Sequence, residues 1–351
     1  IGPCCQRVAD RTTLVPGGGG LTLDVFRGAD HHDIDGGRVA FLADISASGT
    51  QLGVYSNVGQ ASAGTLVEVA LADGVDWSSV ADPWVDGGVV ALRGRQVVPA
   101  ADTILLWDGS NRYVDPGVGY IVSPGTQASI SEDISIFRRY KTGSSQLGLY
   151  DNGFYDVLVT LNSTPVPGQA GVTFSNVNNY PVVDRGGLDV AFRGNGSGGL
   201  LGVYKRVDGG ALEPVADNVT LVPGGVYIPG VGDQVFSMFG EDGLALANGQ
   251  VVFWAEGLSG LEGLYTDIGG ALAVLLDTEA NDTVVLDGVP EQVTRLALSH
   301  KSLAWTPAGY MAVFKATLAS GATAIIRATI NDGSGTGNGT FTVHKDFSDN
   351  N

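Results

Sequence analysis

The stretch Gln51-Leu52-Gly53-Val54-Tyr55 decides the fold, because the same element returns along the chain. Clear copies stand at 147–150, 201–204 and 263–265, and worn copies at 104–107 and 312–314. The aromatic residues that close these copies recur with a period of roughly 50 residues, and a fixed period of that length is the signature of a repeat architecture.

Each repeat predicts three β-strands, of which the Leu-Gly-Val-Tyr element is the second. Strands one and two are short continuous apolar runs, as in sheets covered on both faces, and the third alternates more. Asp-Gly, Gly-Gly and Asn-Gly pairs supply the positive φ of tight hairpins. The first strands are expected at 39–41, 90–92, 135–137, 190–192, 251–253 and 303–305, and the third at 66–69, 120–122, 157–159, 212–215, 272–275 and 324–326.

These columns predict an all-β chain, a six-unit β-propeller-like repeat domain over 24–330. Two β-sandwiches are the alternative, favoured by the unequal unit lengths. The aromatic residues that recur in the first two strands are expected in the core: Phe41, Tyr55, Phe192, Tyr204, Phe253 and Tyr265.

Both ends carry a strand that this alignment leaves surplus. Residues 8–18 match 215–225 at nine of eleven positions, so 1–23 is half a repeat whose preceding half is missing. A Gly-rich linker and a short strand, Thr340–His344, form the C-terminal part, 331–351. The backbone N–H and C=O groups of an unpaired strand need hydrogen-bond partners, which the edge of a sheet offers. Each terminal strand is therefore expected either to complete a sheet of its own chain or to be donated to the next molecule.

The composition excludes some partners. The chain of 351 residues has a net charge of −18, which repels nucleic acid and anionic membranes, and it has no apolar run long enough to insert in a bilayer. It begins at Ile1 without a signal-peptide pattern, so we expect a processed chain or a fragment.

Other features suit the outside of a cell. Adjacent Cys4 and Cys5, the only cysteines, are expected as structural disulfide residues, bonded to one another in a strained ring or to another chain. Five Asn-X-Ser/Thr sequons predict glycosylation, at Asn162, Asn195, Asn218, Asn281 and Asn338, and their occurrence by chance is the alternative. Asn195 and Asn338 are the favoured sites, because both are expected in Gly-rich loops.

One cluster could hold a cation. In the stretch 30–36 (Asp-His-His-Asp-Ile-Asp-Gly), Asp33 and Asp35 are candidate calcium ligands, and a solvated turn is the alternative. Neighbouring His31 and His32 would point to opposite sides of a strand, which disfavours a shared zinc. No catalytic residues are predicted, because the four histidines lie in no known motif and acid pairs such as Glu132/Asp133 and Glu241/Asp242 are common in an acidic chain.

The repeats at 39–55 and 190–225 (Val-Ala-Phe, Leu-Gly-Val-Tyr and Val-Ala-Asp-x-x-Thr-x-Val-Pro-Gly-Gly) resemble those of secreted bacterial β-propeller-like proteins, which are largely uncharacterised. The resemblance covers most of residues 8–330, although units two, three and six are degenerate. It implies an extracellular repeat domain and carries no catalytic residue across.

The sequence therefore favours a non-enzymatic structural or adhesive protein of the cell exterior, without a cofactor. For the terminal strands, completion of a sheet of the same chain is the favoured role, and donation to the next molecule, which would give head-to-tail self-association into a filament, is the alternative. The alternatives are a carbohydrate-active enzyme and a calcium-dependent propeller that binds extracellular glycans.

Overall fold

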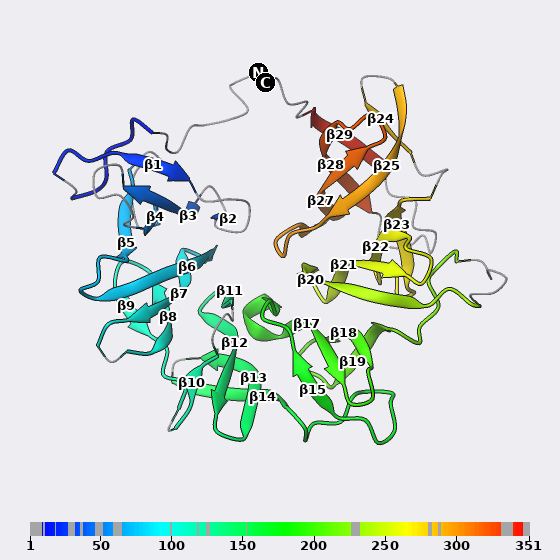
Figure 1. Cartoon of the computed structure of the whole chain (residues 1–351), viewed down its shortest axis with the longest axis horizontal. Coiled ribbons are helices and arrows are strands. Elements are labelled where there is room, and N and C mark those ends of the chain that lie inside the picture. The colour runs from blue at the N-terminus through cyan, green and yellow to red at the C-terminus, as the bar shows by residue number, and fades with distance from the viewer. Residues whose placement is uncertain are drawn as a thin grey trace. The chain divides into compact units, whose positions relative to one another are not determined.

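A computed structural model describes residues 9, 11–17, 19–26, 32–35, 38–45, 52–58, 65–98, 100–117, 119–123, 127–151, 153–225, 232–279, 283–286, 289–330 and 340–346. The chain divides into two compact units, Ile1–Thr160 and Leu161–Asn351. Within the described ranges each unit holds three antiparallel sheets (Figure 1), which we number I–III in the first unit and IV–VI in the second.

The strands of the first unit follow one another along the chain. Sheet I contains β1 (Leu23–Phe26), β2 (His32–Asp35), β3 (Arg38–Ile45), β4 (Leu52–Ser56) and β5 (Val67–Leu71). Sheet II contains β6 (Trp77–Asp86), β7 (Val89–Gln96), β8 (Asp102–Trp107) and β9 (Asn111–Tyr113). Sheet III contains β10 (Ile121–Val122), β11 (Ser129–Ser131), β12 (Ile134–Lys141), β13 (Ser144–Asp151) and β14 (Phe154–Thr160).

The second unit is built in the same way. Sheet IV contains β15 (Phe174–Val177), β16 (Val182–Asp184), β17 (Asp189–Gly196), β18 (Leu201–Arg206) and β19 (Leu212–Asp217), with a short 3₁₀ helix, η1, at Arg185–Gly187. Sheet V contains β20 (Phe236–Ala247), β21 (Gln250–Gly257), β22 (Glu262–Thr266) and β23 (Ala273–Asp277). Sheet VI contains β24 (Thr283–Leu286), β25 (Val289–Ala297), β26 (Leu303–Thr306), β27 (Gly309–Leu318), β28 (Thr323–Ile330) and β29 (Thr340–Asp346).

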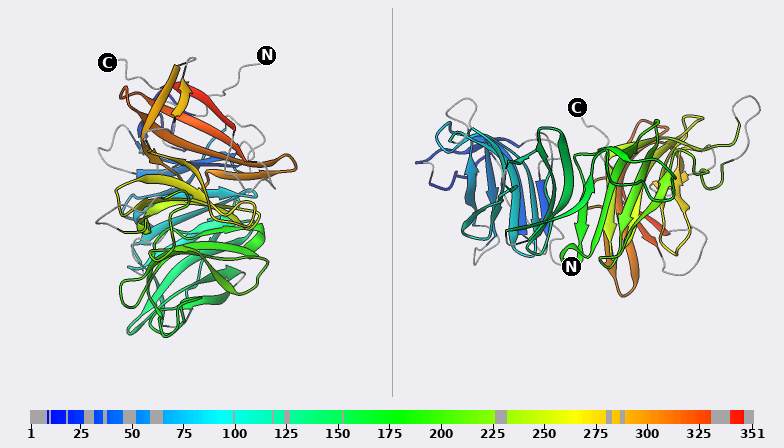
Figure 2. Two further views of the ribbon diagram at one scale, coloured as in Figure 1. Left: turned by 90° about the vertical axis from the view of Figure 1, so that its right-hand side faces the viewer. Right: turned by 90° about the horizontal axis from the view of Figure 1, so that it is seen from below.

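Every sheet contains four strand positions in sequence order, which is the arrangement of a propeller blade (Figure 2), and in sheet VI β24 adds a fifth by pairing with β25. The first position is bent. In sheets I, III, IV and VI it consists of two short pieces that both pair with the second strand, and in sheets II and V it is one strand with bulges. The prediction of an all-β, six-unit propeller-like chain is confirmed. The three predicted strands of most units are positions two to four, and the bent first strand was missed.

The predicted alignment was wrong in two units. Tyr120–Val122 was taken as the last strand of the second unit, but β10 pairs with β12 in sheet III, and β9 completes sheet II. Residues 303–305 were taken as the first predicted strand of unit six, but β26 belongs to the bent first position. The sixth unit is therefore shifted by one strand. Its fourth strand is β29, which pairs with β28 of the same chain and is not surplus.

Packing explains why glycine and tyrosine recur together in the Leu-Gly-Val-Tyr element. Tyr55, Tyr204 and Tyr265 each lie over the glycine two residues earlier, on the same face of the strand. A Cβ added at Gly202 would lie 2.9 Å from the Tyr204 hydroxyl and 2.8 Å from the Ala216 carbonyl oxygen. Only glycine leaves room for the ring, so the two residues recur together.

The recurring aromatic residues are buried, as predicted, in all six cases. In sheet IV the Tyr204 ring meets Phe174 edge-on, with ring centroids 4.9 Å apart. Sheet V repeats this contact between Tyr265 and Phe236 at 4.8 Å. Larger clusters of apolar side chains join neighbouring sheets, sheets I and II in the first unit and sheets V and VI in the second.

The Val-Pro-Gly segment leads the chain into the first strand of three sheets. Val15, Val166 and Val222 each donate a backbone hydrogen bond across a turn, at 2.8–2.9 Å, to Leu21, Val172 and Gln234. The copy at 164–168 (Thr-Pro-Val-Pro-Gly) escaped the sequence comparison. Ahead of this turn, the N-terminal strand with Cys4 and Cys5 lies outside the described residues.

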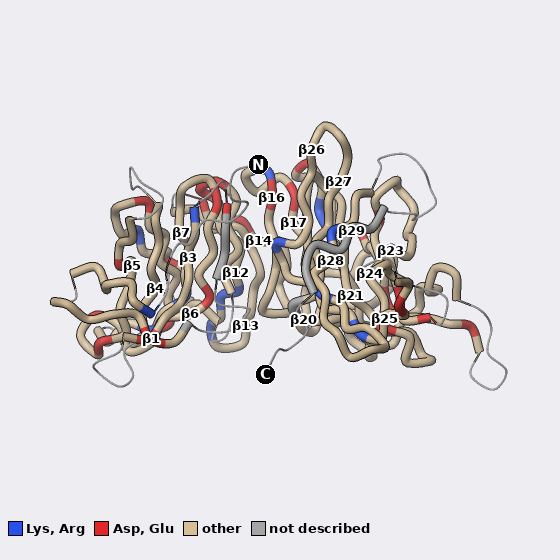
Figure 3. The backbone as a smooth tube through the Cα atoms, turned by 90° about the horizontal axis from the view of Figure 1, so that it is seen from above, with Lys and Arg blue, Asp and Glu red and all other residues tan. Residues whose placement is uncertain are grey.

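The part of the chain that the structure describes contains no helix with the length and apolarity needed to cross a bilayer. Acidic positions are spread over strands and turns of both units (Figure 3).

Candidate functional site

A cavity of about 310 Å³ lies between sheets II and III, inside the first unit. We call it the junction pocket and define it by the residues that line it: Leu106, Arg112, Tyr113, Asp133, Tyr150 and Gly153. Its volume is at the lower end of the roughly 300–1,000 Å³ that ligand pockets occupy.

Sheet II supplies one side of the junction pocket. Leu106 on β8 is buried, and Arg112 stands opposite it on β9. The neighbouring Tyr113 is 47 % exposed, and its ring lies 6.0 Å from Trp77. This side therefore offers an apolar floor and a guanidinium. Tyr113 follows Arg112 on β9, so its ring points to the opposite face of the sheet, where it packs on Trp77.

Sheet III supplies the other side through two hairpin turns and β13. Tyr150 is 9 % exposed, and Gly153, in the turn after β13, has a φ of 95° that favours glycine. Asp133 lies in the turn between β11 and β12. A backbone hydrogen bond from Glu132 to the Asp86 carboxylate, at 2.8 Å, holds this turn against sheet II.

The charged groups of the junction pocket are coupled. Arg112 Nη2 lies 3.1 Å from Asp133 Oδ1 and 3.5 Å from Asp108 Oδ2. A hydrogen bond from the Ser110 hydroxyl lowers the pKa of Asp108, assisted by Arg112 and opposed by burial. Asp108 flanks Arg112 from outside the pocket and is not among the residues that line it.

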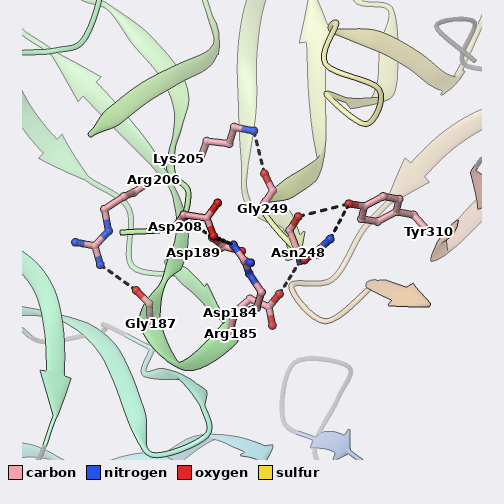
Figure 4. A network of polar contacts seen from close by, with 10 residues as sticks. All are labelled: Asp184, Arg185, Gly187, Asp189, Lys205, Arg206, Asp208, Asn248, Gly249 and Tyr310. Atoms are coloured by element: carbon pink, nitrogen blue, oxygen red, sulfur yellow. Dashed lines mark hydrogen bonds and ion pairs between the residues drawn. The ribbon is translucent and has the colours of Figure 1, made fainter. Parts of the chain in front are cut away.

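The equivalent place between sheets IV and V, which we call the filled junction, holds a polar network (Figure 4). The registers align Lys205 with Leu106, because both face the alanine of the second strand. Lys205 Nζ lies 2.7 Å from Asp267 Oδ2 and 2.9 Å from the Gly249 carbonyl oxygen. Glu213 pairs with Lys205 across the strands as Arg112 pairs with Leu106. Glu213 Oε1 lies 3.5 Å from Lys205 Nζ.

The remaining positions of the two junctions also correspond. Gly249 is the second residue of the turn between β20 and β21, and Asp133 is the second residue of the turn between β11 and β12. Tyr150, within β13, stands opposite Ser135, the first residue of the Ser-Ile-Phe run of β12. Asp267, directly after β22, stands opposite Val251, the first residue of the Val-Val-Phe run of β21. Burial raises the pKa of Asp267, and Lys205 opposes that shift.

A second contact repeats between neighbouring sheets. The aspartate that ends the first strand accepts a hydrogen bond from the turn of the next sheet: Asp35 from Gly87, Asp86 from Glu132 and Asp184 from Asn248, at 2.7–3.1 Å. Between sheets V and VI this hydrogen bond cannot form. Ala247, at the end of the first strand, has no carboxylate, and Pro307, in the turn of the next sheet, has no backbone N–H. There the Tyr310 hydroxyl donates to Asn248 at 3.4 Å instead.

Beside the filled junction, Arg185 has a φ of 49°. It donates to both oxygens of the fully buried Asp189 at 2.5 and 2.6 Å, and to Asp208 at 2.6 Å. These bonds hold the turn between β16 and β17.

The predicted calcium ligands lie on β2. Asp35 accepts the hydrogen bond from Gly87, and the side chain of Asp33 is outside the description. Among the described residues, no group of three or more His, Cys, Asp and Glu is arranged to hold a metal.

The sequons fall in different surroundings. Asn162 is exposed in a turn with a φ of 59°. Asn218 accepts from Leu201 and donates to Gly199, each at 3.1 Å. Asn195 lies in β17 and not in a loop as expected. Asn281 and Asn338 lie outside the described residues.

Sequence reasoning missed Leu106, Arg112, Tyr113 and Tyr150, and it treated Asp133 only as part of an acidic pair. The signal that could have found the junction pocket is the departure from the repeat. Leu106 and Tyr150 occupy positions that carry a lysine and an aspartate in the filled junction.

No protein-family model and no curated protein matches the chain. Solved structures with similar arrangements include the β-propeller domain of the Trilobed protease from Pyrococcus furiosus, which is described as having an open velcro topology. The two chains are 10% identical, the match covers 93% of this chain and 85% of the protease domain, and the TM-score is 0.48. TolB from Acinetobacter baumannii has 12% identity, coverage of 87% and 63%, and a TM-score of 0.42. The SapL1 lectin, solved with alpha methyl fucoside, has 10% identity, coverage of 90% and 94%, and a TM-score of 0.39.

Proposed function

We propose that the chain is a non-enzymatic, adhesive protein of the cell exterior that binds saccharides in the junction pocket. The observation that carries this proposal is the pocket itself. It combines the paired charged groups of Arg112 and Asp133 with a floor of Leu106 and the Tyr150 ring.

Saccharides match that combination chemically. A sugar ring presents C–H groups on its faces, which pack on an aromatic ring, and hydroxyl groups on its rim, which donate to carboxylates and accept from a guanidinium. The five sequons and the net charge of −18 support an extracellular location.

A panel of immobilised polysaccharides and oligosaccharides tests the proposal. We expect at least one glycan to be retained without being shortened, and Asp133→Asn to weaken its retention. Asp156→Asn is the matched control, because Asp156 is an exposed aspartate of sheet III that does not line the pocket. Release of shorter oligosaccharides would support the enzyme alternative, and equal retention by Asp133→Asn would refute the pocket.

The calcium-dependent alternative is separated by the same assay. If Asp33 and Asp35 hold a calcium ion that glycan binding requires, EDTA abolishes retention and added calcium restores it. Binding in the junction pocket as proposed uses only side chains of the protein, so EDTA is expected to leave it unchanged.

Self-association is a second candidate role, and one observation favours it. Sheet VI already has its fourth strand, β29, so the N-terminal copy of the repeat is not needed to complete that sheet. A strand donated from there to another molecule would give a head-to-tail filament, which Cys4 and Cys5 could lock.

Deleting residues 1–15 tests this role. Loss of high-mass polymer with an unchanged fold supports donation. A full-length protein that remains monomeric at high concentration refutes it.

A further inference from the structure

Two positions on the second strand of sheet III differ from those of other sheets. They lie two and four residues after the last residue of the Val-Ala-Phe run or its equivalent, on the same face of the strand as that residue. On β12 both positions hold cations, Arg139 and Lys141. In sheets I, II, IV and V they hold uncharged residues: Ala43 and Ile45, Gly94 and Gln96, Gly194 and Gly196, and Ala255 and Gly257.

The aromatic residue that faces these positions differs as well. In sheets II, IV and V the first strand places a buried aromatic residue opposite the second position: Trp77 opposite Gln96, Phe174 opposite Gly196 and Phe236 opposite Gly257. The register of β10 against β12, continued by one residue, brings Tyr120 opposite Lys141, and Tyr120 is only partly buried. A place that packing closes in three other sheets is therefore open to solvent in sheet III.

The guanidinium of Arg139 is held in place on several sides. Its Cζ lies 3.7 Å from the ring centroid of Tyr155 and 4.0 Å from that of Tyr120. Nε donates to Gln146 Oε1 at 2.9 Å, and Nη1 donates to the Pro116 carbonyl oxygen at 2.7 Å. No hydrogen bond within the described part of the chain engages Nη2, so this nitrogen keeps its two N–H groups for another acceptor.

Lys141 brings a second positive charge to the same ring. Its Nζ lies 4.5 Å from the ring centroid of Tyr120, and the residue is exposed. A hydrogen bond from Lys141 lowers the pKa of Tyr120, with help from Ser144 and Arg139 and against the effect of burial. The two cations therefore already stabilise negative charge at the Tyr120 hydroxyl.

The chain supplies no counter-ion to this pair of cations. It has 37 acidic and 19 basic residues, and several of its arginines form ion pairs with carboxylates: Arg93 with Asp82, Arg95 with Asp102, Arg112 with Asp133 and Arg185 with Asp189. Among the described residues, no carboxylate lies within ion-pair distance of Arg139 or Lys141. Two adjacent cations without carboxylates are suited to the anion of a ligand.

We propose that Arg139, Lys141 and Tyr120 form a binding site for a carboxylate or sulfate group. Arg139 Nη2 and Lys141 Nζ donate charge-assisted hydrogen bonds to its oxygens. The net charge of −18 opposes anions at long range, but at roughly 0.1 M salt that repulsion is screened beyond about 10 Å, so contact with the two cations decides. None of the three residues lines the junction pocket, and the proposal does not depend on saccharide binding there.

Calorimetric titration at low ionic strength tests this site with three probes: sodium sulfate, oligomers of galacturonic acid and neutral oligomers of galactose. Sulfate shows whether a free anion is enough, and galacturonic acid oligomers show whether the carboxylates of an acidic polysaccharide bind. We expect at least one of the two anions to bind and to be released at high salt. Galactose oligomers lack the carboxylate, so none of their binding should depend on Lys141.

Lys141→Gln removes one charge at an exposed position. We expect it to weaken binding of the anion about three- to fivefold, the range of an exposed ion pair, and Arg139→Gln/Lys141→Gln to abolish it. Lys315→Gln is the matched control, because it makes the same charge change at an exposed lysine of sheet VI. Asp133→Asn, which alters the junction pocket, should leave binding of the anion unchanged.

The outcomes decide between an anion site and its absence. Dependence on Lys141 for sulfate supports a site for free anions, and dependence for galacturonic acid oligomers alone supports a site for an acidic polysaccharide. The proposal is overturned if neither anion binds to the wild type, or if Lys141→Gln binds as tightly as the wild type. An equal loss in Lys315→Gln also overturns it, because net charge alone would then explain the effect.

Discussion

The junction pocket and the filled junction occupy the same place between two neighbouring sheets but have opposite contents. In the filled junction, Lys205 reaches the next sheet and pairs with Asp267. In the junction pocket, the shorter and apolar Leu106 stands at the position of Lys205, and a cavity remains. The repeat architecture supplies both junctions, and side chains that depart from the repeat turn one of them into a site.

The first way to test this difference is to break the buried ion pair. In Asp267→Ala, the buried Lys205 loses its nearest counter-ion and keeps only the more exposed Glu213 at 3.5 Å, which should lower the free energy of unfolding by about 3–5 kcal/mol. Urea denaturation measures the change. The double variant Lys205→Met/Asp267→Leu removes both charges and should be far less destabilised. An unchanged denaturation midpoint in Asp267→Ala would show that the pair does not hold the two sheets together.

The second test concerns the regular sheets that flank the filled junction. Tyr204→Ala removes a fully buried ring from the contact with Phe174 and should cost about 3–5 kcal/mol. Tyr204→Phe should cost less than about 1 kcal/mol, because the buried hydroxyl has no hydrogen-bond partner. Thermal denaturation compares the two variants. Equal melting temperatures for Tyr204→Ala and the wild type would refute the alignment of the repeats.

The third test addresses the junction pocket. Arg112→Ala breaks two partly exposed ion pairs, which should change the free energy of unfolding by less than about 1 kcal/mol. The same variant should weaken retention of the glycan found in the panel. A large loss of stability would mean that Arg112 is a structural residue, comparable to Lys205 in the filled junction.

The smallest expected effect is a dependence on pH. The pKa of Asp108 in the folded protein is lowered from its ordinary value of 3.8, so its contribution to stability is present above pH 3.8 and is lost as the pH falls through the folded pKa. Asp108→Asn should therefore be less stable than the wild type at pH 6, and the difference should shrink as the pH falls below 3.8. Urea denaturation at a series of pH values measures the difference, and a gap that persists at the lowest pH would contradict the account.

Much of the fold could be predicted from the sequence, because strands two and three of each sheet repeat a strict pattern. Phe192 and Tyr204 sit in strands whose apolar residues are continuous, and Gly202 is fixed by the ring above it. The first strands escaped prediction because bends and bulges interrupt them: His32–Asp35 is a short polar piece, and Trp77–Asp86 is a longer strand with shifts in register. In sheet VI the added hairpin of β24 and β25 and the unusual Gly309–Leu318 strand shifted the alignment by one strand.

The junction pocket could not be predicted because it depends on registers between strands. The copy at 147–150 looks like the others, yet Phe137 pairs with Gly148, whereas Phe192 pairs with Tyr204. This shift by two residues brings Tyr150 to the position that Asp267 holds in the filled junction. The contact between Arg112 and Asp133 joins two sheets and leaves no mark in the sequence of either.

The central claim is that the open junction is the binding site, and exchanging its contents tests that claim most directly. Leu106→Lys/Tyr150→Asp transfers the lysine and aspartate of the filled junction into the pocket. The measurement is calorimetric titration of the glycan retained in the panel, with Tyr204→Phe as a control outside the pocket and urea denaturation to verify the fold. If the double variant is unfolded, Leu106→Met, which keeps an apolar side chain of similar volume and extends it into the cavity, takes its place. The account predicts that affinity falls by more than about tenfold, which corresponds to 1.4 kcal/mol, while the control binds normally. Wild-type affinity in a folded variant with a filled pocket would contradict it.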